Sequence, residues 1–128
     1  MLDIKSLKKN GKRTAAVVVG LSITGLGTVR SLARAGIRVI GVDSNFSQPS
    51  ARTRYCEKVT CPDVNNEDKL LETLISISKK NKNKPVLFLS SDTSVLVASE
   101  NMELLKQYYH FNLPSRSVVK TLMDKAMF

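Results

Sequence analysis

The sequence predicts an α/β fold, a Rossmann-like doubly wound parallel sheet, and three observations carry this prediction. Short apolar runs occupy residues 15–19, 37–42 and 86–89, and the first of them is rich in β-branched residues. Such runs have no water-facing side, which is typical of strands in a parallel sheet covered on both faces. Patterns with helical periodicity separate the runs, as expected for successive β-α-β units.

The first predicted β-α-β unit extends over residues 15–43. A loop that carries Gly20, Gly25 and Gly27 follows its first strand. Gly36 then ends the helix at a place where a positive φ is usual. The predicted buried face of this helix contains Leu26, Val29, Leu32 and Ala33.

A second crossover helix is predicted between the strands at residues 57–60 and 86–89. Asn65 or Asn66 can cap its N-terminus, and acidic residues in the first turn complement the helix dipole. Its predicted buried stripe contains Leu70, Leu71, Leu74 and Ile75.

The sequence of the C-terminal part predicts two further helical regions, one before and one after a fifth strand. A helix starts at Thr93 and continues with another turn to Lys106, and a short strand follows at residues 108–111. Ser115 caps a last helix, whose inward-facing residues are Val118, Val119, Leu122 and Ala126. Five strands joined by right-handed crossovers give the order 3-2-1-4-5.

Length and composition bound the class of protein. The 128 residues are enough for one domain, which we place at residues 15–128 after a flexible basic leader at residues 1–14. No apolar run is long enough to cross a bilayer. Cys56 and Cys61 are the only cysteines, which disfavours a zinc site and fits a reducing compartment. We therefore expect a cytoplasmic protein without a membrane partner.

The net charge of +9 raises the hypothesis of nucleic-acid binding. The basic residues gather in the leader and at the C-terminal end of the second predicted helix, where positive charge complements the helix dipole. Neither cluster is interleaved with aromatic residues, which make up only 5% of the chain. Such clusters supply salt-sensitive, sequence-independent attraction, and we expect no specific nucleic-acid partner.

The predicted strand order reverses beside the first strand, where open α/β sheets bind their ligands. The loop after the first strand, the Ser90–Asp92 loop after the fourth strand and the arginine-bearing loop after the second strand surround this point. The candidate residues of the substrate cleft are Gly20, Ser22, Gly25, Asp43, Arg52, Arg54, Ser91 and Asp92.

The glycine loop partly matches the dinucleotide-binding fingerprint G-x-G-x-x-G. Gly20, Ser22 and Gly25 hold its three glycine positions, so a serine replaces the glycine that lets pyrophosphate approach the backbone. Asp43 stands where a ribose-binding acid would be; alternatively, it starts a turn and binds its own backbone. A small dinucleotide- or nucleotide-binding module of the oxidoreductase type is therefore the alternative function.

Four stretches together carry a resemblance to a known family: GLSITGLGTVRSLARAGIRVIGVD, SARTRY, KPVLFLSSDTSV and LMDKAMF. The pattern resembles the N-terminal (pre-ATP-grasp) domain of ATP-grasp carboxylate–amine ligases, which are related to the large subunit of carbamoyl-phosphate synthase. The resemblance covers residues 15–128. Its most telling parts are the strand that ends in a Ser-Asp pair and the closing helix with Asp124, Lys125 and Phe128.

The resemblance implies an ATP- and magnesium-dependent ligase when the enzyme is full length. Such enzymes phosphorylate a carboxylate, and an amine then displaces the phosphate. The N-terminal domain forms one wall of the cleft and part of the site for the small-molecule carboxylate or amine. Lys125 is similar to a lysine that reaches the nucleotide phosphates in this family; a solvent-exposed helix lysine is the alternative.

The other candidates each have a structural alternative. Ser22 and Ser91 lie in the predicted cleft loops. Asp92 can hold a substrate amine or hydroxyl, or it can cap the next helix. Arg52 and Arg54 suit carboxylate or phosphate recognition, because their planar groups bind such anions bidentately; alternatively, they are simply solvated.

The sequence stops at Phe128, inside a predicted helix without a capping residue. No carboxylate ligands for magnesium are recognised in it. We therefore expect a fragment of a longer enzyme, whose partners are the missing C-terminal ATP-grasp domains. Alone, the fragment is expected to have no catalytic or metal-binding residue, no tightly bound cofactor and no ligase activity.

Overall fold

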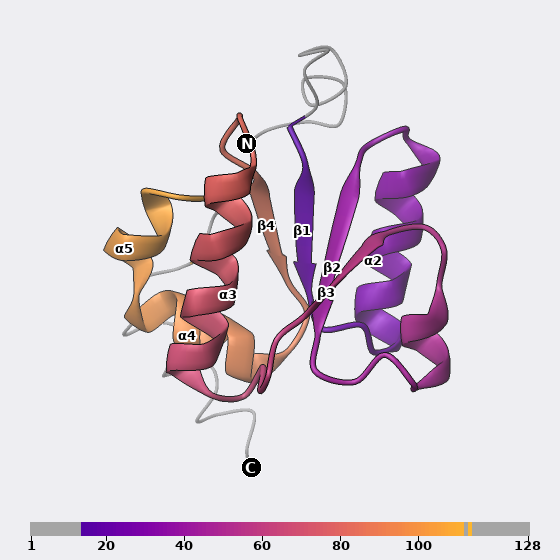
Figure 1. Cartoon of the computed structure of the whole chain (residues 1–128), viewed down its shortest axis with the longest axis horizontal. Coiled ribbons are helices and arrows are strands. Elements are labelled where there is room, and N and C mark those ends of the chain that lie inside the picture. Colours follow the sequence, from indigo (N-terminus) through magenta and orange to yellow (C-terminus); the bar gives the residue numbers. More distant parts are fainter. Residues whose placement is uncertain (1–13, 112, 114–128) are drawn as a thin grey trace.

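A computed structural model describes residues 14–111 and 113 of the chain (Figure 1). Strands and helices alternate along it, as the sequence predicts. The strands are β1 (Ala16–Val19), β2 (Val39–Asp43), β3 (Glu57–Thr60) and β4 (Val86–Leu89). The helices are α2 (Ile23–Arg34), α3 (Glu67–Lys80), α4 (Asp92–Glu100) and α5 (Met102–Lys106), with the short 3₁₀ helix η1 at Pro49–Arg52.

The four strands form one parallel sheet in the order β3-β2-β1-β4. Val19 at the end of β1 is paired with Val42 on one side and with Leu89 on the other. The fold is therefore a Rossmann-like α/β fold, and the order of these strands is the one predicted. The order reverses at β1, which makes its C-terminal end the topological switch point.

The predicted fifth strand at residues 108–111 is only an isolated bridge. His110 pairs in parallel with Val86 beside β4, donating its amide to the Pro85 carbonyl at 2.8 Å and accepting from the Leu87 amide at 2.9 Å. Tyr109 is buried against α3 and donates its hydroxyl to the Leu74 carbonyl at 2.6 Å. The segment thus takes the predicted place at the edge of the sheet but is too short to count as a strand.

The sheet separates two apolar cores (Figure 1). The face covered by α3, α4 and α5 is called here the α3 face, and the face covered by α2 and η1 the α2 face. Alternate residues of β1 point to opposite sides, so that Val17 belongs to the α3-face core and Val18 to the α2-face core. Burying each such valine stabilises the fold by about 1.5–3 kcal/mol. Both strand faces are therefore apolar, as the sequence predicts.

Edge strand β3 departs from this pattern, since three of its four residues are exposed and only Val59 is half-buried. A strand at the edge of a sheet keeps one side of its backbone unpaired, and a charged residue such as Lys58 is a common protection there. The structure thus explains why this segment has a polar sequence while β1, β2 and β4 do not.

In helices α2 and α3, some of the buried residues differ from the predicted ones. In α2, Val29 and Leu32 are buried as predicted, but the third buried residue is Gly25, while Leu26 and Ala33 are half-buried. Gly25 and Gly27 were predicted in the loop, but both lie inside this helix. The close approach of Gly25 to the Gly20 carbonyl, which periodicity does not report, places Gly25 inside.

Helix α3 shows a similar difference. Leu70 and Leu74 are buried as predicted, whereas Leu71 and Ile75 are half-buried and Ile77 completes the stripe. Of the two possible caps, Asn66 is used: its side-chain oxygen accepts the Lys69 amide at 3.1 Å.

Asn101 separates α4 from α5. Its side-chain amide donates to the Val97 carbonyl at 2.8 Å and to Glu67 Oε1 at 2.7 Å. A side chain that binds a carbonyl of the preceding turn competes with the backbone hydrogen bonds of a continuing helix. The predicted helix therefore bends into two pieces, and Asn101 ties the junction to the start of α3.

Three sequence predictions lie outside the described residues: nearly all of the leader at residues 1–14, the last helix from Ser115, and Lys125. Across the described part of the chain, no helix combines the length and apolar character that membrane crossing requires.

Candidate functional site

The candidate site lies at the C-terminal ends of β1, β2 and β4, where three loops meet. These are residues 20–22 after β1, residues 44–48 with η1 after β2, and Ser90 with Ser91 after β4. Side-chain hydrogen bonds join each of the other two loops to the end of β1 and the loop that follows it.

The glycine loop turns sharply because Gly20 has a φ of +89°, a conformation that side-chain-bearing residues rarely adopt. A Cβ added to Gly20 would lie 2.6 Å from Ser90 Oγ. A Cβ added to Gly25 would lie 1.8 Å from the Gly20 carbonyl oxygen. Two of the three fingerprint positions are thus fixed by backbone packing within the protein, so their identity does not require a bound ligand.

Ser90 closes the loop from the β4 side. Its hydroxyl lies 2.6 Å from the Val19 carbonyl oxygen and 2.8 Å from the Gly20 carbonyl oxygen, while its amide donates to the same Val19 carbonyl. The residue therefore bridges the two strands at the switch point. Sequence analysis named Ser91 and Asp92 and missed this role of Ser90, because a serine at a strand end carries no signal of its partner.

Asp43 closes the loop from the β2 side. One carboxylate oxygen accepts the Leu21 amide at 2.8 Å and the Gln48 side-chain amide at 3.0 Å. The other accepts the Ser44 and Asn45 amides at 2.7 and 3.3 Å. The predicted turn at Asp43 is confirmed. The hydrogen bond from the Leu21 amide to Asp43 was not predicted. At 8% exposure, this carboxylate has both oxygens engaged inside the protein.

Ser50 in η1 completes the closure, because its hydroxyl donates to the Leu21 carbonyl at 2.6 Å. Ala51 beside it is fully buried in the α2-face core and holds η1 in place. Arg52 and Arg54 follow on the exposed side of this segment. Arg52 ends η1 and Arg54 lies two residues beyond it, and Ser50, which sequence analysis did not single out, makes the contact to the loop after β1.

Helices α2 and α4 both begin at this edge of the sheet, and their N-termini are capped differently. Ser91 caps α4: its hydroxyl accepts the Ser94 amide at 3.2 Å, and the Ser94 hydroxyl lies within hydrogen-bonding distance of the Ser91 amide. The cap is thus Ser91, and the suggestion that Asp92 caps this helix was wrong. Asp92 is the first helical residue and is exposed, where its charge complements the helix dipole.

Ser22 occupies the same position before α2, but its side chain makes no capping hydrogen bond and is exposed. Its hydroxyl and the first amides of α2 are therefore available to a ligand, unlike those held by Ser91. Of the predicted cleft residues, Ser22, Asp92, Arg52 and Arg54 are exposed, while Gly20, Gly25 and Asp43 serve the internal structure of the loop.

The described residues contain no group of three or more His, Cys, Asp or Glu side chains placed to hold a metal ion. The thiol of Cys56 is half-buried, and burial raises its pKa, which keeps it in the less nucleophilic neutral form. Burial and the neighbouring charge of Lys84 lower the pKa of His110. Neither residue lies in the three loops of the site.

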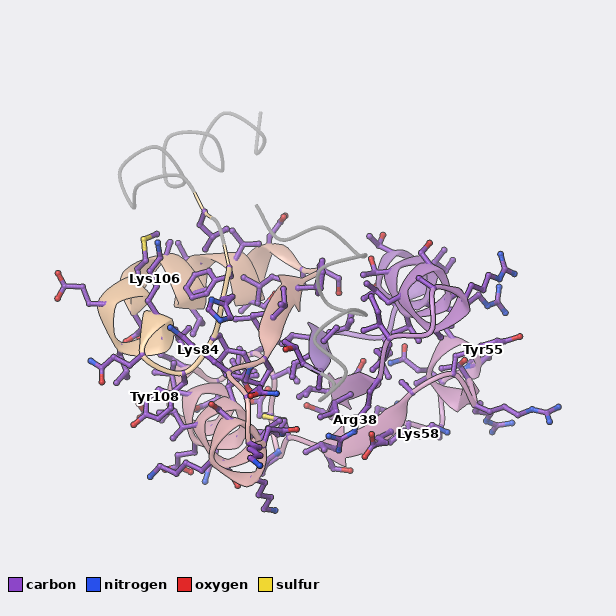
Figure 2. All side chains as sticks on the ribbon, turned by 90° about the horizontal axis from the view of Figure 1, so that it is seen from above. Arg38, Tyr55, Lys58, Lys84, Lys106 and Tyr108 are labelled. Carbon is purple, nitrogen blue, oxygen red and sulfur yellow. The ribbon has the colours of Figure 1, made fainter. Side chains whose placement is uncertain are left out.

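Four cations of the described part of the chain, Arg38, Lys58, Lys84 and Lys106, are labelled in Figure 2. Seen from above the sheet, Lys84, Lys106 and Tyr108 project from one side of the molecule, and Arg38, Tyr55 and Lys58 from the other (Figure 2). Arg38 is neutralised by a two-pronged contact with Glu57, at 2.5 and 3.0 Å. The four labelled cations therefore lie on two sides of the described part of the chain.

A Rossmann-like α/β domain with a closed glycine loop is thus the class that the fold and the site define. The chain matches no protein-family model and no curated protein.

Proposed function

We propose that this chain is the N-terminal, cleft-forming domain of an ATP-dependent ligase that joins a carboxylate to an amine through an acyl phosphate. The carrying observation is Asp43, whose carboxylate is engaged by the protein itself although it stands where a dinucleotide would need a ribose-binding acid. The proposal rests further on the resemblance of residues 15–128 to pre-ATP-grasp domains and on the Rossmann-like order of the strands.

The engagement of Asp43 is the main argument against dinucleotide binding. A ribose hydroxyl would have to displace the Leu21 or Gln48 donor from the carboxylate, and a buried donor left without its acceptor costs about 1–3 kcal/mol. Ser90 and Ser50 donate to carbonyl groups of the loop and fix its shape. A carboxylate held in this way inside the protein suits a wall of a cleft better than a ribose site.

The exposed residues would then contact the small substrate. Ser22 offers a free hydroxyl beside the N-terminus of α2, and Asp92 offers a carboxylate that attracts an ammonium group. Arg52 at the end of η1 and Arg54 beyond it offer exposed guanidinium groups that pair with a carboxylate. In this proposal the domain orients the substrate, while the other domains of the ligase supply the phosphoryl-transfer chemistry.

ATP and magnesium are assigned to those other domains. The described residues offer no cluster of carboxylates for a divalent cation, and Lys125, the proposed contact to the nucleotide phosphates, lies outside them. We therefore assign no catalytic step to the described residues. The 128-residue chain alone is expected to hydrolyse no ATP in the presence of amine substrates.

The first test is to read the source gene beyond the codon for Phe128. The proposal expects the reading frame to continue into a second α+β domain with a glycine-rich loop and Glu and Asn metal ligands. A stop codon at that point would overturn it.

The second test is a titration of the chain with NADH, followed by its fluorescence. We expect no saturable binding at millimolar concentration, because the loop is closed. Stoichiometric binding in the micromolar range would instead establish the dinucleotide-binding alternative.

A further inference from the structure

Lysines gather where α3 ends and the chain enters β4. Residues 79–84 read KKNKNK, and the side chains of all four lysines are exposed. The helix dipole accounts for Lys79 and Lys80 in the last turn of α3, but its effect does not extend to Lys82 and Lys84 beyond the helix. None of the four lies within ion-pair distance of a described carboxylate. The loop therefore presents positive charge that the described part of the chain does not neutralise.

The fold places ring-bearing side chains beside this loop. The His110 amide donates to the Pro85 carbonyl at 2.8 Å, and the Ser78 hydroxyl donates to the Tyr108 carbonyl at 2.8 Å. Segment 108–111 is thus tied to the chain on both sides of the lysine loop. In the sequence the lysines and the aromatic residues are well separated, so only the folded chain brings them together.

A fifth cation comes from α5. The Lys106 ammonium lies 5.9 Å from the centroid of the Phe111 ring, which is within the range of a cation–π interaction. Lys84, Lys106 and Tyr108 project from the same side of the molecule (Figure 2). Residues 79–84 with Lys106, Tyr108 and His110 are called here the lysine–aromatic patch.

We propose that the lysine–aromatic patch binds single-stranded nucleic acid without regard to base sequence. Ammonium groups pair with phosphate oxygens, and planar rings stack on bases, which is the combination that proteins use to hold single strands. The exposed ring of His110 and the half-buried ring of Tyr108 would supply the stacking.

The distribution of apolar side chains favours this partner over an anionic membrane. A membrane surface attracts the same lysines but also takes up an apolar face. The exposed large apolar side chains of the described residues come from separate segments: Ile23 from α2, Tyr55 from the loop before β3, and Leu104 from α5. They form no common face that could enter lipid.

The inference goes beyond the proposed ligase function and does not depend on it. Lys84 stands shortly before β4, so the patch lies at the N-terminal ends of the strands, whereas the candidate site lies at their C-terminal ends. Binding that ignores base sequence also agrees with the expectation of no specific nucleic-acid partner.

The test is a titration of a fluorescent oligothymidylate of about 15 nucleotides with the 128-residue chain, followed by anisotropy. Counterion release from roughly three to five phosphates should raise the dissociation constant on the order of 10- to 100-fold between about 50 and 200 mM salt. In Lys79→Gln/Lys82→Gln/Lys84→Gln we expect binding at the lower salt to weaken at least ~tenfold, with a salt slope smaller by about 2.

The control removes the same charge elsewhere, because residues 1–13 are also basic and binding alone does not locate the surface. It is Arg30→Gln/Lys58→Gln/Lys69→Gln, three exposed cations outside the patch, and we expect less than ~threefold weakening. Equal weakening in the two triple variants would overturn the proposal, as would the absence of saturable binding.

The role of the rings is tested with Tyr108→Leu, which keeps apolar bulk against the α3-face core. We expect it to weaken oligothymidylate binding at least ~fivefold and to leave the affinity for inorganic polyphosphate, which has no bases, unchanged. An equal loss for both polymers, or no loss for either, would overturn the stacking role. If circular dichroism shows that this variant does not fold, the exposed His110→Ser replaces it under the same criterion.

Vesicles that contain phosphatidylserine separate the two kinds of partner. We expect the chain to sediment with them less readily than it binds oligothymidylate at equal salt. Tighter association with the vesicles, lost in the lysine triple variant, would assign the patch to a membrane surface and overturn the proposal.

Discussion

Asp43 shows how one side chain can decide the interpretation of a sequence motif. The residue stands at the position of a ribose-binding acid, yet its four contacts fasten the loop after β1 to the loop after β2. A carboxylate is suited to this task because it accepts hydrogen bonds at both oxygens and has no donor of its own when ionised.

We expect Asp43→Asn to lower the free energy of unfolding by about 2–3 kcal/mol. The new amide group places a donor against backbone donors, so at least one buried N–H loses its acceptor. Urea denaturation at pH 7 measures the loss, with the exposed Asp68→Asn as the control. A loss equal to that of the control would show that the Asp43 contacts contribute little.

Gly25 and Gly27 differ sharply although they are two residues apart in one helix. In Gly25→Ala the new Cβ would collide with the Gly20 carbonyl at 1.8 Å, while in Gly27→Ala it meets no described atom within 4 Å. We expect Gly25→Ala to destabilise the protein by more than ~3 kcal/mol, because backbone atoms have to move.

Gly27→Ala is the matched control, and better helix propensity should keep it at or slightly above the stability of the natural chain. Thermal denaturation followed by circular dichroism compares the two variants. Similar melting temperatures would contradict the close approach of α2 to the glycine loop.

Features of single residues were predictable from the sequence where they depend on residues nearby in the chain. The turn at Asp43 and the positive φ of Gly36 depend on neighbours in the chain, and both are confirmed. The contacts of Ser90 and Ser50 join residues 71 and 29 positions apart, so no local pattern reports them. Their hydroxyl groups find partners only after the sheet has assembled.

At the scale of elements, the two helices that begin at the site offer an internal comparison. Ser91→Ala removes a hydroxyl that accepts the Ser94 amide, and we expect a loss of about 1 kcal/mol in unfolding free energy. Ser22→Ala removes a hydroxyl without a capping bond, and we expect a change near zero. Urea denaturation of both variants checks the difference, and equal losses would show that the Ser91 cap is not effective.

The limits of sequence-based prediction at this scale have identifiable causes. Strands β1, β2 and β4 were predictable because they are apolar on both faces. The end of β3 was predictable because Pro62 follows it closely. The break between α4 and α5 was not, since Asn101 ends the helix partly through its contact with Glu67 on another element. The fifth strand was overestimated because Tyr109 packs with its hydroxyl on α3, which favours a single bridge over a longer ladder.

At the scale of the whole molecule, one polar contact links three elements at the edge opposite the site. Arg38 before β2 binds Glu57 in β3 and donates to Asn81 after α3 at 2.9 Å. The three residues line a groove of about 450 Å³ between α3 and β3. They thereby hold the exposed edge strand against the rest of the sheet.

This contact predicts a pH dependence of stability. The hydrogen bond from Arg38 lowers the pKa of Glu57 below its ordinary value of 4.5, so the folded state favours the charged carboxylate. Its contribution is present above pH 4.5 and is lost as the pH falls through the lowered pKa. Both side chains are about half exposed, which limits the contribution to at most ~1 kcal/mol.

We therefore expect Glu57→Gln to be less stable than the natural chain at pH 7, and the difference in unfolding free energy to be smaller at pH 3, by urea denaturation. The exposed Glu103→Gln serves as the control. A difference between Glu57→Gln and the natural chain that stays constant between the two pH values would contradict the role of the charge.

The closure of the glycine loop has a consequence for motion. Loop amides usually exchange their hydrogens with solvent quickly, but the Leu21 amide is bound to Asp43 and its residue is fully buried. It should exchange as slowly as the amides of β1, because both are released only when β1 and β2 separate. A substrate that arrives at this edge would therefore meet a wall already in its final shape, and binding would carry little entropic cost of ordering the loop.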